Sequence, residues 1–100
     1  MNAVEKVFGN SALHDYKMEK MEIDYPKGTI VLQFLNLRNA IKKFTIRQFI
    51  GIEFTNKEKW GKGTYVVSSD VFYIDNILNI ELQFNSGDFC KIKCYEHRII

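Results

Sequence analysis

The chain is dominated by stretches in which apolar and polar side chains alternate with a period of two residues. The clearest are "NILNIELQF", residues 76–84, and "FCKIKCYEH", residues 89–97. Successive side chains of a β-strand point to opposite faces, so this period predicts strands with one buried face. The residues expected to face the core are Leu78, Ile80, Leu82 and Phe84 in the first stretch and Cys90, Ile92 and Cys94 in the second, with Lys91 and Lys93 outward.

Two further strands are expected near the N-terminus, joined by a tight turn. Residues 21–25 alternate in polarity, and "YPKG" follows as a hairpin turn in which Gly28 takes a left-handed conformation. The next run, "TIVLQFLNL" at 29–37, is apolar on both faces. Such a strand is central in its sheet or is covered on its second face.

The stretch "KFTIRQFIGIEFT", residues 43–55, reads as one long strand. Its length exceeds that of a usual strand, and Gly51 is the expected bend or bulge at which it turns from one sheet to another. Alternation along this stretch predicts that Phe49 faces outward. It predicts that five apolar residues of the opposite parity face inward, namely Phe44, Ile46, Ile50, Ile52 and Phe54.

The fold class that follows is all-β, with residues 1–100 forming a single domain. About six strands joined by short turns favour an antiparallel meander, curled into a small sandwich or a half-open barrel. A short helix at "NAVEKVF", ended by Gly9, is the expected first element. One hundred residues suffice for one core and leave little room for a deep cleft.

The chain carries no apolar run long enough for a signal peptide, and none near the roughly 18 residues that a membrane span needs. The expected location is cytoplasmic, without membrane contact. Cys90 and Cys94 lie four residues apart on one strand, so their backbones should be roughly 13 Å apart, too far for a disulfide. Free thiols agree with a reducing compartment.

Catalytic and metal-binding patterns are weak. His14 and Asp15 are adjacent, but the second histidine, His97, lies near the far end of the sequence. We expect Asp15 to bind backbone amides of a turn ahead of the first strand, with His14 packing beside it. The chain has no phosphate-binding loop, nucleophile elbow or paired cysteine motif. We therefore expect a protein that is not an enzyme and has no cofactor or metal.

A basic stretch and a tryptophan loop are the candidate contact sites. No acid occurs between Asp24 and Glu53, whereas basic residues are frequent there, and "NKEKWGKG" at 56–63 follows. Trp60 either caps the core or is an exposed anchor for another protein. The candidate partner-binding residues are Trp60, Lys57, Lys59, Lys62 and Arg47.

Two parts of the sequence resemble a family. "LHDYKMEKMEIDYPKGTIVLQF" and "WGKGTYVVSSDV" with "IELQFNSGDFCKIKC" are similar to small bacterial YxiG-like β-domains, some of which are regarded as toxin immunity proteins. The likeness covers roughly residues 13–35 and 60–94. It implies no catalytic residue. The positions that match its pattern are His14, Asp15, Trp60, Gly61, Ser86, Gly87 and Asp88.

The expected function is that of a non-enzymatic, immunity-like protein-binding module that acts by occluding a partner protein such as a toxin. The alternative is a small β-barrel that binds single-stranded nucleic acid through residues 38–47 and Trp60. The net charge of only +2 argues against this alternative, because nucleic-acid-binding domains usually carry a larger and more clustered basic excess.

Overall fold

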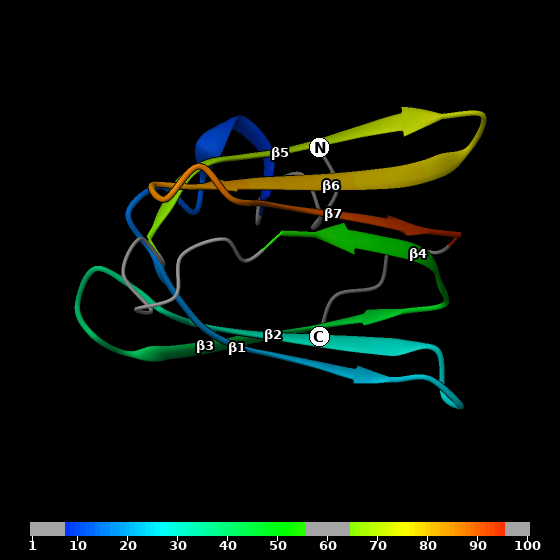
Figure 1. Ribbon diagram of the computed structural model, residues 1–100, viewed down its shortest axis with the longest axis horizontal. Coiled ribbons are helices and arrows are strands. Elements are labelled where there is room, and N and C mark those ends of the chain that lie inside the picture. The colour runs from blue at the N-terminus through cyan, green and yellow to red at the C-terminus, as the bar shows by residue number, and fades with distance from the viewer. Residues whose placement is uncertain (1–7, 56–64, 96–100) are drawn as a thin grey trace.

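The computed structural model describes residues 8–55 and 65–95, and these residues form an almost purely β fold (Figure 1). The strands are β1 (Lys17–Asp24), β2 (Thr29–Leu35), β3 (Ile41–Arg47), β4 (Phe49–Phe54), β5 (Val66–Ile74), β6 (Ile77–Phe84) and β7 (Phe89–Cys94). A short 3-10 turn, η1 (Gly9–Ser11), precedes them. The all-β prediction is confirmed, with one strand more than the six expected.

The strands form two antiparallel sheets that lie face to face as a small sandwich (Figure 1). The three-stranded sheet has the order β1-β2-β3, and the four-stranded sheet has the order β4-β7-β6-β5. Because the two sheets stay separate, the choice between sandwich and half-open barrel is resolved in favour of the sandwich. Each sheet contains a three-strand meander, and β4 extends the second by pairing with β7.

The inward positions of both sheets build one core. Its fully buried side chains include Ile30, Leu32 and Phe34 of β2, Leu78, Ile80 and Leu82 of β6, and Cys90, Ile92 and Cys94 of β7. These are the inward residues that the alternation predicts, except that Phe84 is only partly buried. The strand β2 is central in its sheet, as its two apolar faces indicate.

The chain crosses from one sheet to the other at Gln48 and not at Gly51, but the register shift between Phe49 and Gly51 agrees with the alternative that Gly51 marks a bulge. Gln48 has φ 54, so β3 ends before it and β4 begins after it. The break reverses the parity of Phe49 and Ile50, and the irregular register between Phe49 and Gly51 restores it, so that Ile52 packs against the core as predicted. Phe49 packs against the core instead of facing out, whereas Ile50 and Phe54 are exposed at 40% and 50%.

A second connection joins the sheets at the start of β1 and β5. The amide of Val66 donates to the carbonyl of Tyr16 at 2.8 Å, and the amide of Asp15 donates to the carbonyl of Val66 at 2.7 Å. Lys17 and Tyr65 form an isolated antiparallel bridge beside them. The segment before β1 is thereby fixed to the edge of the four-stranded sheet.

The turns agree with their sequence signals. Gly28 and Gly87 have φ 66 and 92, in the left-handed region that glycine adopts at little cost. The predicted N-terminal helix lies mainly outside the described residues. Its last residue, Phe8, is buried, and its ring packs edge-on against Phe44 with centroids 5.6 Å apart. Within residues 8–55 and 65–95, no helix is long and apolar enough to cross a membrane.

Candidate functional site

Of the five residues that the sequence singles out as a contact surface, the structure describes Arg47. Trp60, Lys57, Lys59 and Lys62 lie outside the described residues. Arg47 is exposed at the end of β3, opposite Thr29 and next to the crossing at Gln48. That these five residues form one partner-binding surface stays a prediction.

The basic strand β3 lies on a face of mixed charge. The outward side chains of β3 include Lys43 and Arg47, but the same face of β1 carries Glu22, whose carboxylate is 2.7 Å from the Lys20 ammonium. The hydrogen bond and charge of Lys20, with a smaller contribution from Lys43, lower the pKa of Glu22. The outward positions of β1–β3 that the structure describes hold no aromatic side chain for base stacking. This face therefore gives the nucleic-acid alternative no support.

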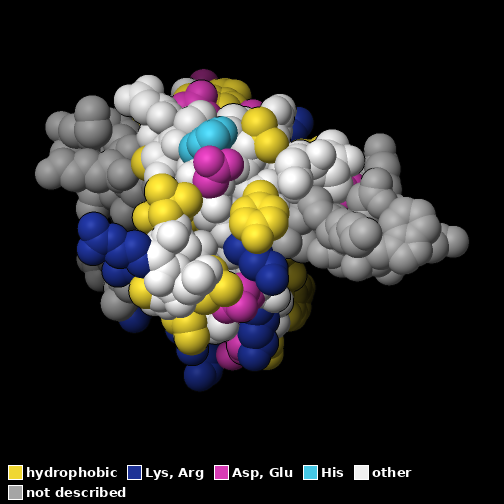
Figure 2. All heavy atoms as spheres, turned by 90° about the vertical axis from the view of Figure 1, so that its left-hand side faces the viewer, with side chains coloured by type: hydrophobic (Ala, Val, Ile, Leu, Met, Phe, Trp, Pro, Cys, Tyr) yellow, Lys and Arg dark blue, Asp and Glu magenta, His cyan; other side chains and the backbone are white. Residues whose placement is uncertain are grey.

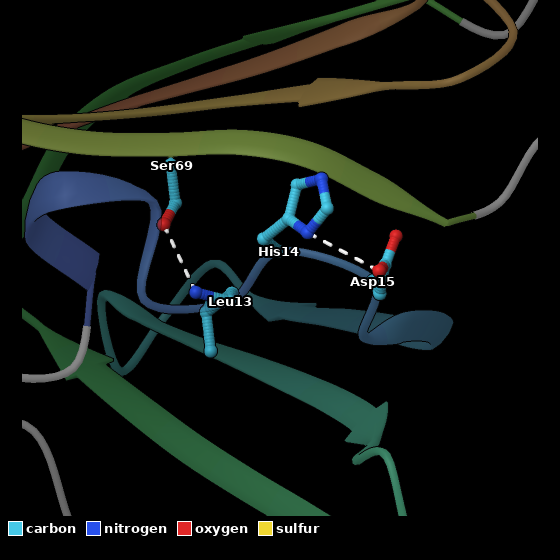
Figure 3. Close-up of polar contacts among 4 residues, drawn as sticks. All are labelled: Leu13, His14, Asp15 and Ser69. Carbon is cyan, nitrogen blue, oxygen red and sulfur yellow. Dashed lines mark hydrogen bonds and ion pairs between the residues drawn. The ribbon is translucent and has the colours of Figure 1, made fainter.

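The His14–Asp15 pair is a surface contact. Nδ1 of His14 is 3.2 Å from the Asp15 carboxylate, and the two side chains are 58% and 65% exposed (Figure 3). Figure 2 shows the imidazole and the acid side by side on the surface. The carboxylate contacts its own neighbour, whereas the sequence predicts contacts with turn amides. Asp15 has φ 67 and is held by its backbone.

Ser69 of β5 fixes the same segment. Its hydroxyl oxygen accepts a hydrogen bond from the amide of Leu13 at 3.3 Å, and Leu13 is buried (Figure 3). His97 lies outside the described residues. Across the two ranges that the structure describes, no group of three His, Cys, Asp or Glu side chains is placed to hold a metal ion. The arrangement therefore points to anchoring of the N-terminal segment.

Both cysteines are free and buried in the core face of β7. Burial raises the pKa of Cys90 from 9.0 to about 12 and that of Cys94 to about 11. A thiol is a nucleophile only as its thiolate, so neither cysteine is reactive near neutral pH. They pack as small apolar residues.

The two thiols give a prediction about pH. Folded thiols keep their protons up to pH 11–12, whereas unfolded thiols lose them from about pH 9. Raising the pH above 9 should therefore lower the free energy of unfolding, and replacing both cysteines by alanine should flatten this part of the pH profile. At pH 8 a disulfide reagent should label both thiols in urea and neither in the folded protein. Rapid labelling of the folded protein would contradict the burial.

The outer face of the four-stranded sheet is the most distinctive surface among the described residues. The register of the paired strands aligns the outward side chains in rows across β4, β7, β6 and β5. The first row is charged and consists of Glu53, Lys91, Glu81 and Asp70. The second row consists of Gly51, Lys93, Asn79 and Phe72. Ile74 and Ile77 form an apolar pair beyond them.

These rows enclose an open groove of about 420 Å³. Gly51 forms part of its floor, and a Cβ atom added there would meet nothing within 4 Å. Phe72 and Ile74 line the opposite side, and Ile74 is 55% exposed. Gly51 lies on the edge strand β4 beside Lys93 of β7, and the absence of its side chain leaves this part of the groove open.

The charges beside the groove are not neutralised by close ion pairs among the described residues. Lys91 has Glu81 and Glu53 as cross-strand neighbours, yet no ion pair within 4.0 Å joins it to either in this part of the chain. Its ammonium lies 5.1 Å from the centre of the Phe89 ring instead. The face thus combines apolar side chains, a hollow and charges that are available to another molecule.

The alternation of the sequence places Lys91, Lys93 and Glu81 outward correctly, whereas Asn79 on the same face is buried at 6% exposure; the alternation does not identify this face as a site. The signal that could have found it is the presence of apolar side chains at outward positions of β5 and β6, at Phe72, Ile74 and Ile77. A solvated face usually carries polar residues at such positions.

No protein-family model matches the chain, and no curated protein matches it either.

Proposed function

We propose that this protein is a non-enzymatic protein-binding module whose contact surface is the outer face of β4-β7-β6-β5. It acts as the resemblance to immunity-associated domains implies, by covering the surface of a partner protein. The observation that carries the proposal is the groove between Gly51 and Phe72, whose lining combines apolar side chains such as Phe72 and Ile74 with charged ones such as Lys91 and Glu81.

The composition of this face fits a protein interface. Interfaces combine an apolar centre with aromatic anchors and a polar rim. Here Phe72, Ile74 and Ile77 supply the apolar part, while Glu81 and Lys91 supply the rim. The groove is open to solvent along the sheet surface and is not an enclosed cavity, which suits a macromolecular partner better than a small substrate.

The test is site-specific photo-crosslinking in cells of the source organism. Phe72 is replaced by p-benzoylphenylalanine, which keeps an aromatic ring at the groove, and adducts are identified by mass spectrometry. We expect a discrete protein adduct. The matched control carries the same crosslinker in place of Lys43, at an exposed position on the outer face of the other sheet.

Gly51→Thr provides the second arm of this test. A Cβ atom at position 51 meets nothing within 4 Å, so the threonine side chain extends into the groove. The adduct at position 72 should therefore decrease by about tenfold or more while the protein stays folded. Equal adducts at positions 72 and 43, or an adduct that Gly51→Thr leaves unchanged, would refute the proposed surface.

A further inference from the structure

We infer that the outer face of the four-stranded sheet pairs with the same face of a second copy of this chain, about a two-fold axis that runs along the strands between β6 and β7. This pairing rests on the proposed function, because it uses the same contact face. It adds the identity of one partner, which is the chain itself.

The charges of the first row select this axis. A two-fold axis along the strands places β7 of one copy over β6 of the other and keeps each row in line. Lys91 then faces Glu81 of the second copy, and the same pair occurs twice by symmetry. An axis across the strands would instead place β7 over β7, so that Lys91 and Lys93 would face lysines of the other copy.

The shape of the second row agrees with the same axis. Strands β4 and β5 are the two edges of the sheet, so the axis places β4 of one copy over β5 of the other. Gly51 and Phe72 lie in one row on these two strands. The ring of Phe72 therefore lies opposite the hollow at Gly51 of the second copy, again twice by symmetry.

One contact in this arrangement is unfavourable. Glu53 and Asp70 occupy the edge positions of the charged row, so they face each other between copies. These carboxylates stay at the hydrated rim, where charges are screened, while the favourable Lys91–Glu81 contacts lie beside the axis.

The test is sedimentation velocity of the purified chain over a range of concentrations. We expect a monomer–dimer equilibrium in the micromolar range. Lys91→Glu places like charges opposite each other twice and should weaken the dimer at least about tenfold. Adding Glu81→Lys to it restores opposite charges and should recover most of the affinity. Gly51→Thr should also dissociate the dimer, because it fills the hollow for Phe72.

Lys43→Glu, a charge reversal on the other sheet, is the matched control and should leave the dimer unchanged. Thermal unfolding verifies that each variant is folded. A chain that is monomeric at several hundred micromolar would overturn the inference, as would a dimer that Lys91→Glu and Gly51→Thr leave intact, or a failure of the double charge reversal to restore pairing.

The two proposals fail in different ways. A monomeric chain whose Phe72 crosslinker captures a different protein overturns self-pairing and supports the proposed function. A monomeric chain without any adduct at position 72 overturns both.

Discussion

Replacing Phe34 by alanine is expected to lower the free energy of unfolding by about 4 kcal/mol. Phe34 is fully buried near the end of β2, and its ring lies 6.0 Å from that of Phe44 and 6.4 Å from that of Tyr16. The substitution removes apolar burial and two aromatic contacts, and it leaves a cavity between the sheets. Chemical denaturation followed by circular dichroism measures the effect.

Tyr25→Ala is the matched control for this prediction. Tyr25 is an aromatic residue in the β1–β2 turn that is 84% exposed, so its loss should change the free energy of unfolding by less than about 0.5 kcal/mol. If Phe34→Ala cost no more than this control, Phe34 could not lie in the core and the sandwich fold would be wrong.

Replacing Asp88 by alanine is expected to cost about 2–3 kcal/mol of stability. Asp88 is only 6% exposed, and its carboxylate accepts hydrogen bonds from the hydroxyls of Thr55 at 2.7 Å and Ser86 at 2.8 Å. The same hydroxyl oxygens accept from the amides of Phe89 and Asp88. This network ties the β6–β7 turn to the end of β4, so its loss leaves several polar groups without partners.

The control for this network is Asp24→Ala. Asp24 also accepts a backbone hydrogen bond in a turn, from Lys27, but that bond is exposed and 3.3 Å long. Its loss should cost well under about 1 kcal/mol in the same urea titrations. An Asp88→Ala variant as stable as Asp24→Ala would show that the network does not hold the turn. The network also gives a structural role to Ser86 and Asp88, two of the positions that carry the family resemblance.

Much of the fold could be predicted because strand periodicity is a local property. The inward faces of β6 and β7 follow directly from alternation, as at Ile80 and Ile92. The alternation gives the wrong direction for Phe49 because it assumes that one continuous strand runs across Gln48. A left-handed residue there need not be glycine, so the sequence carries no strong signal of the break.

The hairpin between β5 and β6 could have been predicted more precisely. Asp75 and Asn76 have φ 51 and 65, which are the two positive values that a two-residue hairpin loop needs. Asp and Asn are among the residues that accept these conformations most readily. The alternation of residues 76–84 predicts β6, but it does not identify the loop that joins β6 to β5.

The candidate site could not be predicted because it depends on which strands are neighbours. Gly51 and Lys93 are far apart in the chain, and only the pairing of β4 with β7 brings them together. Local patterns show that a side chain faces outward, but they do not show what lies beside it. For the same reason, a basic stretch such as β3 revealed nothing about the acids of β1 that accompany it.

The claim that the outer face of β4-β7-β6-β5 pairs with the same face of a second copy is tested most directly by amide spectra of the ¹⁵N-labelled chain over a dilution series. We predict concentration-dependent shifts at Gly51, Phe72, Asn79 and Lys91, and constant positions at Val31, Gln33 and Thr45 on the other sheet. Spectra that do not change with concentration, or shifts confined to β1–β3, would contradict it.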